Sequence, residues 1–111
     1  MGLNMETLNI DLYQFKAMQY RLESADATYA LLNLGAEAGE VLGVAAKYQR
    51  DGSDYPTVVD NISKELGDVM WMVAAVASDF GLRLSDICVQ NLTKLEDRQK
   101  RNAIKGSGDS R

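Results

Sequence analysis

The strongest constraint on the fold is one short segment, residues 51–56, which reads Asp-Gly-Ser-Asp-Tyr-Pro. It contains the chain's single proline, together with a glycine and two aspartates, residue types that end helices and form turns. On both sides of this segment apolar residues recur every three or four positions, the period of an amphipathic helix, and no strand pattern is seen. The sequence therefore predicts two long helices joined by a tight turn, within an all-α chain.

The same periodicity predicts four helices that form a small bundle. The first is expected over about residues 6–23. Asp26 is a suitable N-cap for a second helix, which runs to about Arg50. The third helix follows the turn and ends before Gly81, a suitable C′ residue, and Ser85 is expected to cap the fourth.

The chain length of 111 residues fits one domain. We expect a helical domain over residues 1–104 and a flexible tail over residues 105–111, which is rich in Gly and Ser. The apolar runs are too short and interrupted to span a membrane.

The single cysteine, Cys88, lies on the expected apolar face of the fourth helix, and a buried thiol is predicted. Because no leader opens the chain and no internal disulfide can form, a cytoplasmic location is expected.

The composition excludes several kinds of chemistry. With no histidine and one cysteine, the chain lacks the ligands for zinc and the residues for Ser-His-Asp triads or Cys-His dyads. Catalysis would have to use carboxylates, Lys, Arg, Tyr or hydroxyls. The net charge of −4 argues against nucleic acid as the main partner. That charge is uneven, because residues 1–93 carry −7 and residues 94–111 carry +3.

Two acidic pairs, Glu37 with Glu40 and Glu65 with Asp68, lie three residues apart on the second and third expected helices, so each pair shares a helix face. The midpoint of the four lies within the turn. In an antiparallel hairpin the two pairs would therefore face each other at the same height. Partly buried carboxylates repel one another unless a cation neutralises them, and Mg²⁺ or Mn²⁺ prefers such oxygen ligands. On spacing alone, the alternative of two solvated helix margins with ordinary surface acids stays open.

The basic end of the chain carries a second set of polar residues. Asn91, Lys94 and Arg98 fall within one arc of the fourth expected helix, and Lys105 and Arg111 follow in the tail. Lys and Arg suit phosphate oxygens, so a cation held by acids beside this stripe would suit phosphoryl or nucleotidyl chemistry. The alternative is compensation of the helix dipole by cations near a helix C-terminus.

Trp71 lies on the side of the third expected helix that is opposite its apolar stripe. We therefore expect an exposed indole that packs against a partner helix or stacks on a nucleobase. Packing in a homodimer is the favoured interpretation.

The segments 34–41 (Leu-Gly-Ala-Glu-Ala-Gly-Glu-Val) and 65–71 (Glu-Leu-Gly-Asp-Val-Met-Trp) together resemble the paired acidic motifs of the MazG-like nucleoside triphosphate pyrophosphohydrolases. Residues 91–98 resemble the fourth helix of that family. Residues 106–111 are similar to a C-terminal signature of its compact phage and bacterial members. The resemblance covers nearly the whole chain in the expected order.

The resemblance implies an all-α fold that forms a dimer or a dimer of dimers. It implies Mg²⁺-dependent hydrolysis of nucleoside triphosphates to monophosphate and pyrophosphate, with Mn²⁺ as a substitute ion. The implied metal ligands and catalytic residues are Glu37, Glu40, Glu65 and Asp68. The implied substrate contacts are Asn91, Lys94 and Arg98. By their charge alone, Lys105 and Arg111 in the tail are additional candidate phosphate contacts. The candidate base contacts are Tyr13 and Gln14, which resemble the family's first helix, and Trp71.

The chain also departs from the family pattern. Where many members have Tyr four residues after the motif aspartate, this chain has Met72, and Ser110 stands where Asn is expected in the tail. Glu40 is the candidate for the acid nearest the attacking water. An alternative from another class is a non-catalytic helical module that oligomerises or binds a nucleotide.

Overall fold

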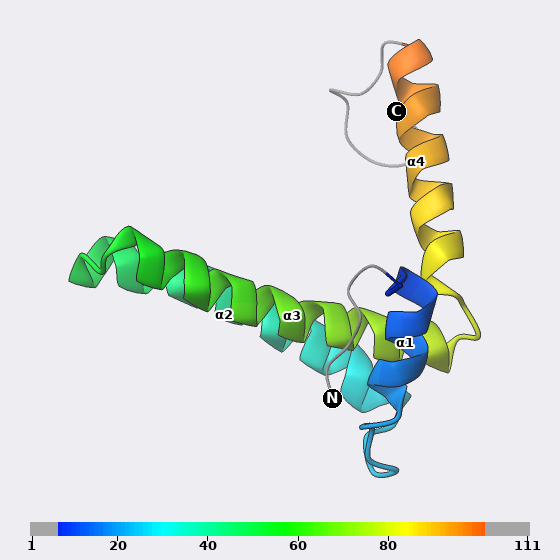
Figure 1. Cartoon of the computed structure of the whole chain (residues 1–111), viewed down its shortest axis with the longest axis horizontal. Helices are drawn as coiled ribbons and strands as arrows, with labels where there is room; N and C mark the ends of the chain where they lie inside the picture. Colours follow the sequence, from blue (N-terminus) through cyan, green and yellow to red (C-terminus); the bar gives the residue numbers. More distant parts are fainter. Residues whose placement is uncertain (1–6, 102–111) are drawn as a thin grey trace.

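The computed structural model describes residues 7–101, and this part of the chain contains four helices and no strand (Figure 1). The helices are α1 (Ile10–Met18), α2 (Ala27–Asp51), α3 (Tyr55–Asp79) and α4 (Leu84–Lys100). The prediction of an all-α chain with four helices is confirmed. The expected tail, residues 105–111, lies outside the described residues.

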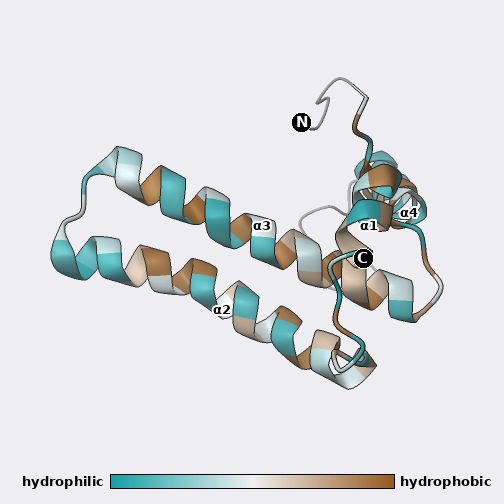
Figure 2. Ribbon diagram, turned by 60° about the horizontal axis from the view of Figure 1, so that its bottom comes forward, coloured by the Kyte–Doolittle hydropathy of each residue, from teal (hydrophilic) through white to brown (hydrophobic). Residues whose placement is uncertain are grey.

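Helices α2 and α3 form a long antiparallel hairpin, which Figure 1 shows with α3 in front of α2 and Figure 2 shows with the two helices side by side. Gly52 ends α2 in the left-handed conformation, with φ 67°, which a glycine adopts without strain. Asp54 then caps α3 by accepting a hydrogen bond from the Thr57 N–H at 3.1 Å. Pro56 occupies the first turn of α3, where its missing N–H costs no helical hydrogen bond. The predicted turn is confirmed.

Helix α1 is shorter than the predicted residues 6–23. After Ile10–Met18 the chain turns, and the Arg21 guanidinium donates hydrogen bonds to two carbonyl oxygens of the α1–α2 connection and to both carboxylate oxygens of Asp79. These contacts stabilise a non-helical connection. The apolar periodicity that continues to Leu22 is therefore misleading, and this side chain is exposed.

The core lies where α1, the C-terminal half of α3 and the first turn of α4 meet. Its centre consists of Ala74, Ala77 and Leu84, and Leu84 is 2% exposed. The partly buried side chains packed around this centre are Ile10, Tyr13, Met18, Val73 and Ile87. Toward the turn the hairpin lies outside this core, and apolar residues are spaced along both of its helices (Figure 2).

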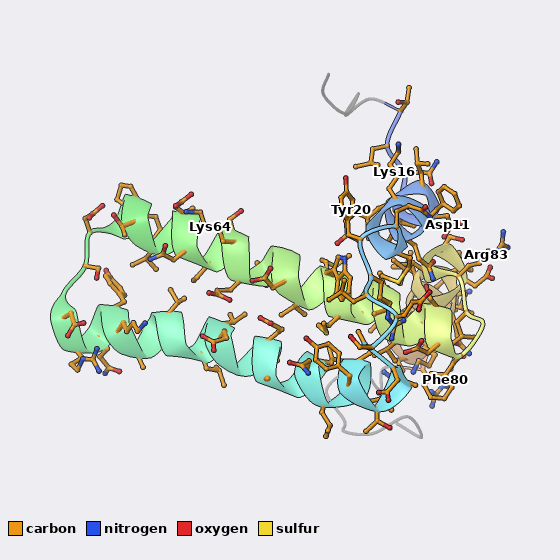
Figure 3. The ribbon with its side chains drawn as sticks, turned by 90° about the horizontal axis from the view of Figure 1, so that it is seen from below. Asp11, Lys16, Tyr20, Lys64, Phe80 and Arg83 are labelled. Carbon is orange, nitrogen blue, oxygen red and sulfur yellow. The ribbon has the colours of Figure 1, made fainter. Side chains whose placement is uncertain are left out.

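The N-terminus of α4 is capped by side chains of α1. The Leu84 N–H donates to Gln14 Oε1 at 2.9 Å, and the Ser85 N–H donates to Asp11 Oδ1 at 2.9 Å. Figure 3 shows Asp11 beside Arg83 at this junction. The prediction that Ser85 is the N-cap is wrong, because Arg83 holds that position and α1 supplies the capping groups.

Beyond its first turn, α4 extends away from the hairpin (Figure 1). Cys88 is exposed, so the prediction of a buried thiol is wrong. The reason is that α4 packs mainly on α1, which covers only its beginning.

Among residues 7–101, no helix combines the length and the apolar character needed to cross a lipid bilayer.

Candidate metal and substrate site

Three of the four predicted acids converge near the middle of the hairpin. Carboxylate oxygens of Glu37 on α2 and of Glu65 and Asp68 on α3 all lie within 4.8 Å of one another. Glu37 and Asp68 are equally far along the chain from the turn, and the antiparallel hairpin brings residues at equal distances to the same height. The symmetry about the turn thus brings Glu37 to the level of Asp68 as predicted, but the expected convergence of all four acids is not seen, because Glu40 does not join the group.

The electrostatics of this acid cluster favour a bound cation. Glu37 is half-buried, and burial, followed by the negative charges of Asp68, Glu65 and Glu40, raises the pKa of its carboxyl. The ionised cluster is therefore unfavourable by itself. A set of carboxylate oxygens at this spacing fits a hard divalent ion such as Mg²⁺ or Mn²⁺.

Glu40 lies outside this close group and is exposed. It is one helical turn from Glu37, and its charge still contributes to the raised pKa of Glu37. Its predicted role as a metal ligand or catalytic acid stays a prediction.

An open cavity of about 390 Å³ lies beside the acid cluster, at the junction of α1 and α3. It is lined by Leu8, Asn9, Ile10, Tyr13, Gly67 and Met70. Gly67 directly precedes the cluster residue Asp68. Burial and the charge of Asp68 raise the pKa of Tyr13, so its phenol stays protonated near neutral pH and can donate a hydrogen bond. The cavity thus lies next to the acid cluster along α3, and the two are linked electrostatically through Tyr13 and Asp68.

The other two candidate base contacts have partners within the protein. The Gln14 amide donates to the Ser78 hydroxyl and to the Leu82 carbonyl, besides capping α4. The Trp71 indole N–H donates to the Ala17 carbonyl at 3.1 Å. Trp71 is half-buried, so the prediction of an exposed indole is wrong. The end of α1 packs on that side of α3, which the helical projection of α3 alone could not indicate.

The predicted phosphate contacts lie on α4, apart from the acid cluster. Asn91 is exposed, Lys94 is half-buried and Arg98 is 5% exposed. The structure does not bring them onto the acids of the same chain, because α4 extends away from the hairpin (Figure 1). Lys105 and Arg111 lie outside the described residues.

Two positions bear on the departures from the family pattern. Met72 is 5% exposed, so its side chain is buried within the protein. Ser110 lies outside the described residues.

The cavity wall also includes Ile10 and Met70, which the sequence interpretation missed. The spacing of Ile10 and Tyr13, three residues apart on one face of α1, is the signal that could have indicated this wall.

Comparisons with known proteins agree with this architecture. The sequence model of the MazG nucleotide pyrophosphohydrolase domain matches residues 26–102, which include α2, α3 and α4. The chain is also similar to the Gene 37 protein of Mycobacterium phage L5. The two are 35% identical over 114 residues, an alignment that covers 94% of this chain and 100% of the phage protein. No solved structure matches the chain significantly.

Proposed function

This chain belongs to the MazG nucleotide pyrophosphohydrolase domain family, and on that premise we propose that it is a Mg²⁺-dependent nucleoside triphosphate pyrophosphohydrolase. The proposed reaction yields nucleoside monophosphate and pyrophosphate. The observation that carries the proposal is the convergence of Glu37, Glu65 and Asp68 within 4.8 Å beside a cavity. Mn²⁺ is the expected substitute ion.

The acids have two proposed roles. Glu37, Glu65 and Asp68 would hold the cation, which when bound supplies positive charge to the phosphate oxygens. Glu40, exposed one turn from Glu37, is proposed to accept a proton from the attacking water. The water oxygen forms a bond to the α-phosphorus, and the bond from that phosphorus to the bridging oxygen of pyrophosphate breaks.

The cavity between α1 and α3 is the proposed pocket for the nucleobase. Its volume of about 390 Å³ is within the range of small-molecule sites, and its lining is mainly apolar with a few polar groups. Tyr13 is the proposed base contact. Gln14 and Trp71, which have partners in the fold, are proposed to support the pocket wall.

The phosphate chain is proposed to contact the basic end of the protein. The residues assigned to this contact are Asn91, Lys94 and Arg98, together with Lys105 and Arg111. Lys and Arg are suited to phosphate oxygens by charge and by hydrogen-bond geometry. The proposed assembly is a homodimer or a dimer of dimers.

The decisive experiment incubates the protein with a panel of ribo- and deoxyribonucleoside triphosphates in Mg²⁺ and measures pyrophosphate and orthophosphate separately. We expect pyrophosphate and the monophosphate. Release of diphosphate and orthophosphate would contradict attack at the α-phosphorus. Glu65→Gln should lower turnover by roughly 100-fold or more, because it removes charge from the cation site. Asp60→Asn is the matched control, since Asp60 lies on the same helix and pairs with Lys64.

A non-catalytic helical oligomerisation or nucleotide-binding module is the alternative, and the large exposed apolar side chains of the hairpin favour it. It predicts that Glu40→Gln leaves function intact and that Mg²⁺ does not change the thermal stability. A Mg²⁺-dependent rise in Tm that disappears in Glu65→Gln would favour the enzyme.

A further inference from the structure

Two polar side chains, Asn9 and Tyr13, lie in the wall of the cavity between α1 and α3. The other described residues of the lining have no strong hydrogen-bonding side chain; they are Leu8, Ile10, Gly67 and Met70. Asn9 and Tyr13 are four residues apart at the start of α1, so they lie one helical turn apart on the same face. Recognition of a ligand by the side chains of this wall therefore depends on these two residues.

The orientation of the Asn9 amide is fixed by its role as the N-cap of α1. Its Oδ1 accepts a hydrogen bond from the Leu12 N–H at 2.9 Å. A backbone N–H can be paired only by an acceptor, so the amide oxygen must face the helix and the NH2 group must face away from it. Asn9 is exposed, and its NH2 group, which donates hydrogen bonds and accepts none, is left to meet a ligand in the cavity.

The two polar groups differ in their position relative to the acid cluster. Tyr13 is near enough to Asp68 for the charge of that carboxylate to act on its phenol. Asn9 lies about 6 Å nearer the start of α1. Because α1 runs across α3, its first turn projects beyond the hairpin toward α4 (Figure 1). A nucleotide with its phosphates at the acids would therefore place its sugar near Tyr13 and the outer edge of its base near Asn9.

The outer edge of a nucleobase, opposite its sugar, carries the group that divides the bases into two classes. Uracil and thymine, like guanine and hypoxanthine, have an oxygen there, which accepts hydrogen bonds. Cytosine and adenine have an amino group there, which donates them. The NH2 group of Asn9 can pair with the oxygen, whereas it would leave an amino group and itself without an acceptor. The Tyr13 hydroxyl can donate or accept, so it does not distinguish the two classes.

We propose that Asn9 makes the cavity selective for nucleotides of oxo bases, the class of uracil, thymine, guanine and hypoxanthine, over nucleotides of amino bases. The N-cap hydrogen bond holds the donor in one orientation, so the selectivity is a property of the start of α1. This inference rests on the proposed function for the place of the nucleobase. It adds the class of base, on which the acid cluster has no bearing.

The test measures binding without turnover. The α,β-methylene triphosphates of uridine and cytidine, and of inosine and adenosine, are titrated in Mg²⁺ by calorimetry, in their ribo and deoxyribo forms. The members of each pair differ at the outer edge of the base. The wild type should bind the oxo member of each pair about tenfold more tightly, because it gains one hydrogen bond and leaves no donor unpaired. Equal Kd values within either pair, tighter binding of an amino member, or no binding of any analogue would overturn the proposal.

Two substitutions keep an N-cap on α1 and change the group that meets the base. Asn9→Asp retains a capping oxygen and replaces the NH2 donor with an acceptor, so the preference should reverse in favour of the amino bases. Asn9→Ser also caps a helix, but its short hydroxyl can donate or accept, so the preference should disappear. A wild-type preference that persists in both variants would overturn the role of Asn9.

The matched control is Gln19→Glu, which makes the same change from amide to acid in an exposed side chain at the other end of α1. Gln19 lines a different cavity, so the preference for oxo bases should stay. Circular dichroism checks that each variant folds, and Asn9→Ser decides the role of Asn9 if Asn9→Asp does not fold.

Hydrolysis of the natural triphosphates separates this proposal from the proposed function. A wild type that binds the oxo analogues selectively and releases no pyrophosphate would contradict the proposed function and leave the selectivity of the cavity in place. A wild type that releases pyrophosphate with the same kcat/KM from oxo and amino triphosphates would contradict the selectivity alone.

Discussion

Asp11 and Ser85 are 74 residues apart in the chain, yet both the backbone N–H and the hydroxyl of Ser85 donate hydrogen bonds to the Asp11 carboxylate. With the neighbouring bond from the Leu84 N–H to Gln14, they satisfy two of the backbone donors that begin α4. A short first helix thereby determines where the fourth helix begins and in which direction it leaves.

Asp11→Ala should destabilise the protein and loosen α4. The substitution leaves a helix N-terminus without its capping carboxylate, and a lower Tm on the order of 5 °C is expected. Hydrogen exchange of the amides in the first turn of α4 should accelerate more than exchange in the hairpin. Asp86→Ala is the control, because that side chain is exposed and forms a surface ion pair with Arg83. Equal effects of the two variants would contradict the capping role.

The pH dependence of this contribution has a defined sign. Hydrogen bonds from Ser85, and to a smaller extent the charge of Arg83, lower the pKa of Asp11 in the folded protein below its ordinary value of 3.8. The unfolded chain therefore takes up the proton first as the pH falls. The stability difference between wild type and Asp11→Ala should stay constant above the ordinary value and shrink as the pH falls below it. Denaturant unfolding at a series of pH values measures this difference.

Arg21→Ala should destabilise the protein by about 2 kcal/mol, because it removes charge-assisted hydrogen bonds that are partly shielded from water. The Arg21 and Asp79 side chains are 14% and 17% exposed, and their closest contact is 2.7 Å. Denaturant unfolding monitored by circular dichroism measures the change. Arg50→Ala removes an ion pair whose side chains are 69% and 51% exposed and are therefore screened by water, so it should change the stability far less than Arg21→Ala does. Comparable losses would contradict a special role for Arg21.

The sequence predicted those parts of the fold that depend on local chemistry. Asp26 caps α2, Gly52 lies in the turn of the hairpin, and Gly81 follows α3 with φ 69°, all as expected. Each of these residues acts on backbone groups within a few positions of itself. The end of α1 was predicted wrongly because Arg21 contacts Asp79, 58 residues away, and such a contact leaves no local pattern.

In the candidate site, too, features set by local sequence were predictable, and features set by contacts between distant segments were not. The meeting of Glu37 with Asp68 followed from their equal distances to the turn, which a single hairpin is enough to enforce. The surroundings of Trp71 and the cavity beside Tyr13 depend on how α1 packs across α3. The helical period of one segment gives no information on the angle at which another segment crosses it.

Glu37→Gln should raise the stability of the metal-free protein slightly and abolish its stabilisation by Mg²⁺. Because the pKa of Glu37 is raised in the folded state, its ionised form opposes folding, and the metal-free wild type should gain stability as the pH falls through that raised value. In the wild type, Mg²⁺ at about 100 times its Kd should stabilise the fold by about 2.7 kcal/mol. Thermal unfolding in EDTA and in Mg²⁺ measures both effects.

The control for Glu37→Gln is Asp60→Asn, which removes an exposed carboxylate from α3 at a distance from the cluster along the helix. This variant should keep the full response to Mg²⁺. If both variants lost the response, Mg²⁺ would be acting by general screening of the negative charge on the hairpin. It would not be binding at a defined site.

Tyr13→Phe should separate binding of the nucleoside from the chemical step. The raised pKa of Tyr13 keeps its hydroxyl protonated, so the hydroxyl can donate one neutral hydrogen bond to a ligand in the cavity. Loss of such a bond, about 1 kcal/mol, should raise KM for the preferred triphosphate about fivefold and leave kcat within about twofold, because the ring still fills the cavity wall. Steady-state kinetics across the triphosphate panel measures both constants. If the hydroxyl instead acts on the reacting phosphate, kcat should fall at unchanged KM, and the assignment of the cavity to the nucleobase would then be contradicted.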